Sequence, residues 1–153
     1  MKTVALLLAT IAMGLMSGVY ASFAFSVMPG LRGADDRTFV DVMQRLNVAI
    51  LNGWFLFCFL GGLVFGLVAL VLTWRTPALP WVGLGLGLYA VSLLITFVVN
   101  VPLNNALMAA GSPATADVGA VRAAFEARWV TWNIVRGLAS TAGFACLCWS
   151  LRL

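Results

Sequence analysis

The last apolar segment of the chain opens with Trp129-Val-Thr-Trp132-Asn133-Ile-Val-Arg136. In a helix, both tryptophans, Asn133 and Arg136 share one face, because they stand at positions i, i+3, i+4 and i+7. The residues from Gly137 to Leu151 carry no charge. Arg136 is therefore the single charge in a long apolar stretch.

The depth of Arg136 follows from the length of a membrane span. A helix needs about 20 apolar residues to cross the hydrocarbon. Counting back that far from Arg152 reaches Trp132, which places Arg136 about one turn inside. An ionisable residue at such a depth is a candidate functional residue that faces the protein interior or a wet cavity. The other interpretation is an aromatic belt with an arginine extending to the headgroups.

Composition indicates an integral membrane protein. Of the 153 residues, 63% are hydrophobic and 9% are charged, and the mean hydropathy is +1.04, whereas soluble domains carry about 25% charged residues. Histidine is absent, so the usual ligand of haem, copper or catalytic zinc is missing, and we expect no metal and no cofactor. A net charge of +4 informs topology rather than nucleic-acid binding. The three cysteines lie in apolar runs and are interpreted as buried small hydrophobic residues.

Four apolar segments predict an all-α membrane protein, an antiparallel bundle of four transmembrane helices in a single domain over residues 1–153. The short link from Arg75 to Pro80 requires its flanking segments to be antiparallel neighbours. The N-terminus resembles a signal peptide, but its apolar run continues to Pro29, so we expect it to be retained as the first span. The expected spans are residues 3–28, 53–74, 79–108 and 129–151.

The two longer links are expected to be amphipathic. Asp35 and Asp36 can cap a helix over about residues 35–52, with an apolar face that includes Phe39 and Met43. A second helical extension is expected from Asp117 into the last span. Small residues recur four apart within the spans, and such stripes allow helices to pack closely in lipid: Gly14, Gly18, Ser22 and Ser26; Gly62 and Gly66; Gly83 and Gly87; Ala139 and Gly143.

Polar side chains gather at one depth, on the side of the longer links. Counting about 20 residues into each span reaches Phe23, Trp54, Asn100 and Trp132. The uncharged polar groups at this level are Tyr20, Ser22, Ser26, Asn47, Asn52, Asn100, Asn104, Asn105 and Asn133. We therefore expect one polar layer, covered on its outer side by the amphipathic links.

The third span adds a polar stripe at i, i+4 spacing, formed by Ser92, Thr96, Asn100 and Asn104. Pro102 within it lacks an N–H and crowds the carbonyl of Val98, so irregular backbone is expected at a place where protein or water can satisfy it. One interpretation is polar contact between spans three and four. The other is a ligand pocket, because Arg136 and two tryptophans lie at the same level.

The chemistry of such a pocket is constrained by its residue types. It offers one cation, amides, hydroxyls and indoles, but no acid or histidine as a strong base. This suits a flat, apolar, oxygen-bearing molecule from the lipid, whose enolate or phenolate the amides and Arg136 stabilise. Hydrolysis, phosphoryl transfer and metal redox chemistry are disfavoured.

Several short motifs resemble one family of small membrane proteins, the anthrone oxygenase-like family, most of whose bacterial members have no assigned function. The resemblance covers nearly the whole chain, and one departure is Asn52-Gly53 where the family usually has Asn-Pro. The motifs are Met28-Pro29-x-Leu31, Asp36-Arg37-Thr-Phe39, Met43-Gln44-Arg45-x-Asn47, Asn52-x-Trp54-Phe55, Asn100-Val-Pro102-Leu-Asn104-Asn105 and Trp129-x-x-Trp132-Asn133-x-x-Arg136.

The resemblance implies oxidation of an anthrone to an anthraquinone by dioxygen without a metal or flavin. On this hypothesis Arg136 and Asn133 hold the enolate oxygen, and Asn100 and Asn104 orient the ring system, on which Trp132 stacks. The candidate catalytic residues are Arg136, Asn133 and Asn100. The candidate substrate-binding residues are Asn104, Trp132, Trp129, Asn47, Tyr20 and Trp54.

Two other functions stay open. One is a non-catalytic membrane protein, either a lipid or quinone binder or a small structural subunit of a complex. The other is a channel or transporter, which is weaker because one buried arginine gives no aqueous path unless the protein forms a homo-oligomer. The expected partners are membrane lipids and an apolar aromatic or quinone-like molecule. We expect a location in the bacterial inner (plasma) membrane with cytoplasmic termini, although a bare count of Lys and Arg favours the opposite orientation.

Overall fold

The computed structural model describes residues 1–153 and is entirely helical. Its five continuous helices are Lys2–Leu31, Asp36–Ala49 (α3), Gly53–Leu72 (α4), Leu79–Ala109 and Val118–Ser150 (α7). The first and fourth contain π-helical turns. The first consists of α1 (Lys2–Ser22), η1 (Phe23–Val27) and α2 (Met28–Leu31), and the fourth of α5 (Leu79–Ile95), η2 (Thr96–Asn100) and α6 (Val101–Ala109). The predicted all-α class is confirmed.

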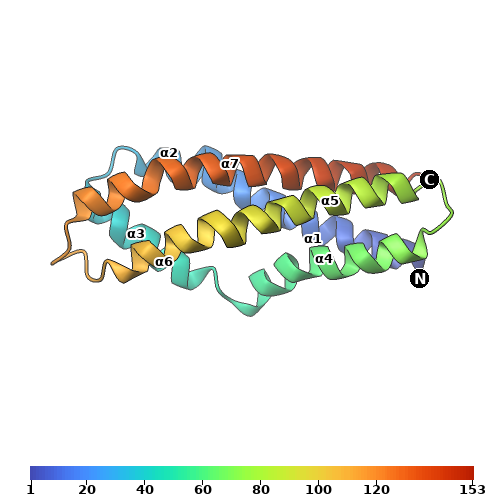
Figure 1. The fold of residues 1–153 in the computed structure, drawn as a ribbon, viewed down its shortest axis with the longest axis horizontal. Coiled ribbons are helices and arrows are strands. Elements are labelled where there is room, and N and C mark those ends of the chain that lie inside the picture. The colour runs from blue at the N-terminus through green and yellow to red at the C-terminus, as the bar shows by residue number, and fades with distance from the viewer.

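The long helices lie side by side along the longest axis of the molecule (Figure 1). Both termini and the link between α4 and α5 lie at one end, and α3 lies near the other. Helix α1 packs against α4 and α7, and α5 packs against α7, whereas α4 and α5 approach each other less closely. Nearer α3, residues of α4 and of η2 both line a cavity.

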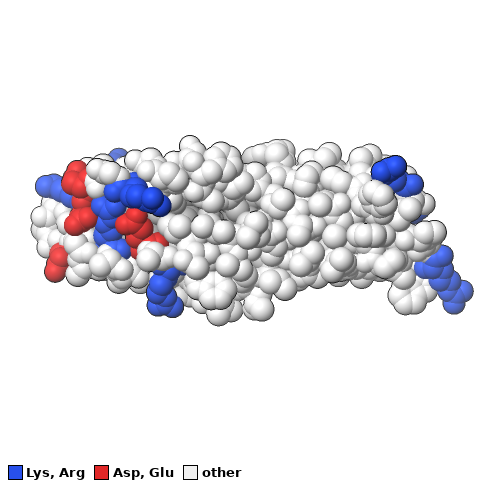
Figure 2. Space-filling model, turned by 90° about the horizontal axis from the view of Figure 1, so that it is seen from above, with Lys and Arg blue, Asp and Glu red and all other residues white.

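Three helices are long and apolar enough to cross a membrane: Lys2–Leu31, Gly53–Leu72 and Leu79–Ala109. They indicate an integral membrane protein. Figure 2 shows charged side chains at the two ends of the molecule and a long uncharged surface between them. Helix α7 is not among the three, and it carries Asn133 and Arg136 in its apolar half.

Local capping explains where three of the helices begin. Asp35 accepts a hydrogen bond from the backbone N–H of Thr38 (3.0 Å) at the start of α3, and Asp117 caps α7 in the same way. Asn52 accepts from the N–H of Phe55 (2.9 Å) at the start of α4. The amphipathic helix expected over residues 35–52 therefore ends at Ala49, because Asn52 begins the next helix.

Glycines permit the closest approaches between helices. A Cβ on Gly143 would lie 2.7 Å from the carbonyl oxygen of Gly85, and a Cβ on Gly62 would lie 2.7 Å from the ring of Tyr89. The predicted stripe at Gly83 and Gly87 was wrong in register. A Cβ on Gly87 would have no atom within 4 Å, and the close contact with α7 is made by Gly85, which stands between Gly83 and Gly87 in the sequence.

The Gly85–Gly143 approach predicts that Gly143→Ala destabilises the protein by about 1–3 kcal/mol, because the new methyl group must displace backbone. Gly87→Ala is the matched control on α5, since its Cβ enters open space and alanine is the better helix former. Thermal unfolding in lipid nanodiscs, followed by tryptophan fluorescence, measures both variants. Equal midpoints for the two would contradict the close approach.

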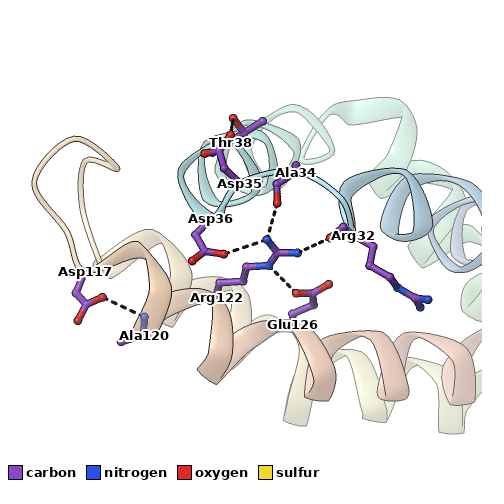
Figure 3. A network of polar contacts seen from close by, with 9 residues as sticks. All are labelled: Arg32, Ala34, Asp35, Asp36, Thr38, Asp117, Ala120, Arg122 and Glu126. Atoms are coloured by element: carbon purple, nitrogen blue, oxygen red, sulfur yellow. Dashed lines mark hydrogen bonds and ion pairs between the residues drawn. The ribbon is translucent and has the colours of Figure 1, made fainter.

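Arg122 ties the beginning of α7 to the link between α2 and α3 (Figure 3). Its guanidinium donates to the carbonyl oxygens of Ala34 (2.8 Å) and Arg32 (3.1 Å) and pairs with Asp36 (3.0 Å) and Glu126 (2.7 Å). The Glu126 hydrogen bond is the main cause of the raised pKa of Arg122. These contacts hold α3 against α7 above the polar layer.

Asp35 makes part of this end sensitive to acid. The hydrogen bonds from the Thr38 backbone N–H and hydroxyl lower the pKa of Asp35 below its usual value of 3.8. Because a depressed pKa stabilises the fold only while the group is ionised, this contribution is complete above pH 3.8 and is lost as the pH falls through the folded-state value. We expect Asp35→Asn, which keeps a cap without a charge, to flatten the dependence of the unfolding midpoint on pH below about 4. An unchanged acid dependence in this variant would assign the effect to another group.

Candidate functional site

Arg136 lies in the interior of the helix assembly, with only 8% of its surface exposed. Its Nε and Nη2 donate to Oδ1 of Asn133 (3.3 and 3.0 Å), and its Nη1 donates to Oγ1 of Thr96 (3.2 Å). The guanidinium carbon lies 4.5 Å from the ring centroid of Tyr20 and 5.4 Å from that of Trp129. The interpretation of Arg136 as a residue that extends to the headgroups is therefore wrong.

No carboxylate compensates the charge of Arg136. The three ion pairs of the structure involve Arg45 and Arg122, both at the charged end. The partners of Arg136 are an amide oxygen, a hydroxyl and two aromatic rings. Three of its five N–H groups donate hydrogen bonds. Two N–H groups and the positive charge therefore remain without a partner in the protein.

Asn133 holds this arginine in place from within α7. It is fully buried, and its Nδ2 donates to the carbonyl oxygen of Tyr20 (3.0 Å). The amide is thereby fixed with Oδ1 toward the guanidinium. Because Asn133 joins α1 and α7 while orienting Arg136, its position is that of a supporting residue behind the guanidinium.

A second group of polar contacts lies one turn closer to α3. The indole Nε1 of Trp129 donates to Oδ1 of Asn104 (2.7 Å), and Nδ2 of Asn100 donates to the carbonyl oxygen of Trp129 (3.3 Å). Phe23 packs against the same indole at 5.4 Å between ring centroids. These contacts fix Trp129 between η1 and the segment formed by η2 and α6.

A cavity of about 340 Å³ extends from Arg136 toward α3 and α4. Its wall combines polar and aromatic side chains at the inner end with aliphatic side chains from α3 and α4. The lining residues are Val19, Tyr20, Phe23, Leu46, Asn47, Ile50, Leu51, Phe55, Leu56, Phe59, Leu60, Thr96, Phe97, Val101, Asn104, Trp129 and Arg136. This composition, mostly apolar with a few convergent polar groups, is typical of small-molecule sites.

Several buried polar atoms in this region have no hydrogen-bond partner within the protein. Two of them belong to residues that line the cavity, the hydroxyl of Tyr20 and Nδ2 of Asn47. The others are Oγ of Ser92 and Oδ1 of Asn100. Buried polar groups are normally paired, so these four atoms are exceptions, and they lie close to the cavity.

The structure brings five of the predicted site residues to the cavity wall: Tyr20, Asn47, Asn104, Trp129 and Arg136. Asn100 and Asn133 are fully buried and do not line the cavity. Trp132 and Trp54 lie outside it, with 38% and 68% of their surfaces exposed.

The tryptophan positions have a simple explanation in helix geometry. The buried face of α7 includes Trp129, Asn133 and Arg136, and at 100° per residue Trp132 stands on the edge of that face. Trp54 lies in the first turn of α4, where its ring stacks on Phe57 at 5.9 Å between centroids. Neither tryptophan lines the cavity, because depth in the membrane does not specify which face a residue occupies.

The candidate site residues did not include four residues that line the cavity: Thr96, Phe55, Phe59 and Phe97. Thr96 belonged to the recognised polar stripe of the third span, and its i, i+4 relation to Asn100 was the available signal. The phenylalanines carried no signal, because apolar residues on a membrane helix are equally expected toward lipid.

Both π-helical turns flank the site and end two residues before a proline. In η1 the N–H of Met28 bonds to the carbonyl of Phe23, with Pro29 next, and in η2 the N–H of Val101 bonds to the carbonyl of Thr96, with Pro102 next. The wider turn gives room around the carbonyl that each proline ring crowds. The irregular backbone expected near Val98 is present as η2, whereas the matching turn in the first helix was not anticipated.

Comparison with known protein families gives a match over the larger part of the bundle. The family described as anthrone oxygenase matches residues 53–146, which include α4, η2 and the polar face of α7. None of the curated proteins and none of the solved structures matches the chain. Because the matched region covers more than half of the 153 residues and contains Arg136 with its partners Thr96 and Asn133, the chain belongs to the anthrone oxygenase family.

Proposed function

We propose that the protein is a membrane-embedded oxygenase that oxidises a flat, apolar, oxygen-bearing aromatic molecule with dioxygen. The observation that carries this proposal is the Arg136 guanidinium, buried without a carboxylate partner at the wall of a 340 Å³ cavity. A buried cation is costly unless a group of opposite charge accompanies it. An anionic enolate or phenolate oxygen is such a group.

The donors around the cavity restrict the ligand further. Arg136, Tyr20 and Asn47 line it, and each carries N–H or O–H donors. A ligand that satisfies them carries at least two oxygen acceptors on an otherwise apolar body. Hydroxylated anthrones and their quinones have this pattern.

For an anthrone, the proposed step begins with loss of a proton from the carbon opposite the carbonyl. The electron pair delocalises onto the carbonyl oxygen as an enolate, which Arg136 and Tyr20 stabilise. Dioxygen accepts the electrons and forms a bond to the ring carbon, and the peroxide takes up the proton. Loss of one water molecule from the hydroperoxide then gives the quinone, so anthrone and dioxygen yield anthraquinone and water.

The remaining side chains position these groups. Asn133 orients the guanidinium, and Asn100 and Asn104 hold Trp129 against the cavity. Trp129, rather than Trp132, is the indole available for contact with the ring system. Asn47 contacts a second oxygen from α3.

We further propose that α7 is the fourth span of an antiparallel bundle. Its apolar half lies alongside α5 and α1, and its C-terminal end lies at the same end of the molecule as the N-terminus and the α4–α5 link (Figure 1). The two termini lie on the cytoplasmic side of the plasma membrane of a bacterium, because Lys2, Arg75 and Arg152 occupy that end without acidic residues.

The test uses the full chain purified into lipid nanodiscs. Anthrone is added in air, anthraquinone is followed by absorbance, and dissolved oxygen is measured in parallel. We expect one dioxygen consumed per anthraquinone formed, at a rate well above that of empty nanodiscs. A rate equal to that of empty nanodiscs would exclude anthrone oxidation.

A second function, non-catalytic binding of a quinone or lipid, is favoured by one observation. No carboxylate or imidazole lines the cavity, so the cavity wall contains no strong base that could remove the proton from an anthrone. This function predicts saturable quenching of tryptophan fluorescence by anthraquinone, with no oxygen consumption. Measuring quenching and oxygen uptake on the same sample separates the two functions.

A further inference from the structure

The cavity opens on the side of the molecule, between α4 and η2. Four of its lining residues are also substantially exposed: Leu51 (68%), Phe97 (56%), Leu60 (49%) and Leu56 (42%). All four are apolar. In contrast, Tyr20, Trp129 and Arg136 at the inner end are at most 8% exposed. The cavity is therefore apolar at its mouth and polar at its inner end.

The mouth begins next to the contact that joins α4 to α5. The hydroxyl of Tyr89 donates to the carbonyl oxygen of Phe59 (2.8 Å) and holds the two helices together. The ring of the same Phe59 makes an edge-to-face contact with Phe97, which joins α4 to η2 with ring centroids 5.7 Å apart. Both rings line the cavity, so they form the side of the opening.

This opening lies on the apolar side surface of the molecule. Leu56 and Leu60 belong to α4, and Phe97 belongs to the helix Leu79–Ala109, and both helices are long and apolar enough to cross the membrane. Their neighbours on the same outer surface, Phe57 and Val98, are 53% and 63% exposed. A mouth with apolar residues on all sides has no favourable contact with water.

The route from the charged end is closed by packed side chains. Phe39 and Met43 of α3 are fully buried and pack with Trp129 of α7 in one cluster. The contacts of Arg122 hold the α2–α3 link over this cluster. A ligand from the aqueous side would have to displace both.

We propose that the ligand enters and leaves sideways from the bilayer, passing between Leu60 of α4 and Phe97 of η2. The occupant of this route is a molecule already dissolved in the membrane, with a flat apolar ring system and oxygen acceptors. The inference rests on the proposed function for the identity of the site. It assigns Leu60 and Phe97 to passage, separate from the groups that hold the ligand.

The test measures binding of 1,8-dihydroxyanthraquinone to the full chain in lipid nanodiscs. Leu60→Trp narrows the mouth, and Leu67→Trp is the matched control, because Leu67 lies on the same helix with nearly the same exposure (48%) and does not line the cavity. The emission of the probe, recorded after rapid mixing, gives association and dissociation rate constants. The equilibrium dissociation constant is obtained by titration.

We expect Leu60→Trp to slow association and dissociation alike by about tenfold and to leave the equilibrium constant nearly unchanged. Leu67→Trp should behave like the unaltered protein. Phe97→Ala, which widens the same opening, should accelerate both rates, and it keeps the test valid should Leu60→Trp fold poorly.

The outcomes separate the entry route from the function. Unchanged rates in Leu60→Trp and Phe97→Ala, with normal binding by the unaltered protein, would overturn the lateral route alone. Failure of the unaltered protein to bind the probe would overturn the proposed function and the route with it. Equal rates for anthraquinone-2-sulfonate, supplied in water and excluded from lipid by its charge, would place the entrance on the aqueous side and also overturn the route.

Discussion

Replacing Arg136 with leucine is expected to lower the turnover of anthrone by about 10²–10³-fold, the effect of removing a donor from an oxyanion site. The guanidinium supplies the positive charge in the cavity, and its nearest polar partners, Asn133 and Thr96, are neutral. Arg136→Lys should retain part of the activity, because an ammonium keeps the charge but not the planar donors. Oxygen consumption and quinone formation in nanodiscs provide the measurement.

The control for this variant is Arg128→Leu, which removes an exposed arginine from the same helix. It should leave turnover unchanged. Thermal unfolding distinguishes catalysis from structure, because Arg136 also bridges α7 and η2 through Thr96. Loss of stability in Arg136→Leu with unchanged turnover per folded molecule would assign Arg136 to packing alone.

The second large effect is expected from Asn133→Asp. The new carboxylate occupies the position from which Oδ1 already accepts from Nε and Nη2 of Arg136, so the side chains remain in contact. The guanidinium is then neutralised by the protein itself and no longer attracts an anionic enolate. We expect turnover to fall about 10²-fold, while binding of the neutral anthraquinone changes far less.

Asn105→Asp is the matched control, since it introduces the same charge at an exposed position and should leave both quantities unaffected. The two measurements also test the charge argument itself. If Asn133→Asp weakens quinone binding as much as it slows turnover, the variant has altered the shape of the cavity and the role assigned to charge is wrong. If neither quantity changes, the uncompensated guanidinium has no part in the reaction.

The site could be predicted in part because charge and polarity are costly in hydrocarbon. Arg136 and Asn133 had to turn inward, or else toward the headgroups, and the short list of polar residues at their depth contained their partners. The same cost predicts an inward position for Thr96, which belongs to the polar stripe of the third span. For these residues the free-energy cost of exposure to lipid is large, so only an inward or headgroup position is favourable.

Tryptophan, phenylalanine and glycine gave less secure predictions. Trp132 and Trp54 are 38% and 68% exposed, and an indole is as well accommodated by lipid as by a cavity. The contact at Gly85, rather than Gly83 or Gly87, depends on the rotation of α5 against α7. In a membrane no hydrophobic driving force selects that rotation.

Local chemistry along the chain thus determines the helical class, the helix starts at Asp35, Asn52 and Asp117, and the depth of the polar layer. These properties depend on backbone hydrogen bonds, side-chain caps and the cost of polar groups in lipid, all of which act within a few residues. The tertiary structure alone decides that α4 and η2 lie on two sides of a cavity in front of Arg136, so that they are separated there. That separation results from packing between distant segments, in which many small contacts compete and no single residue dominates.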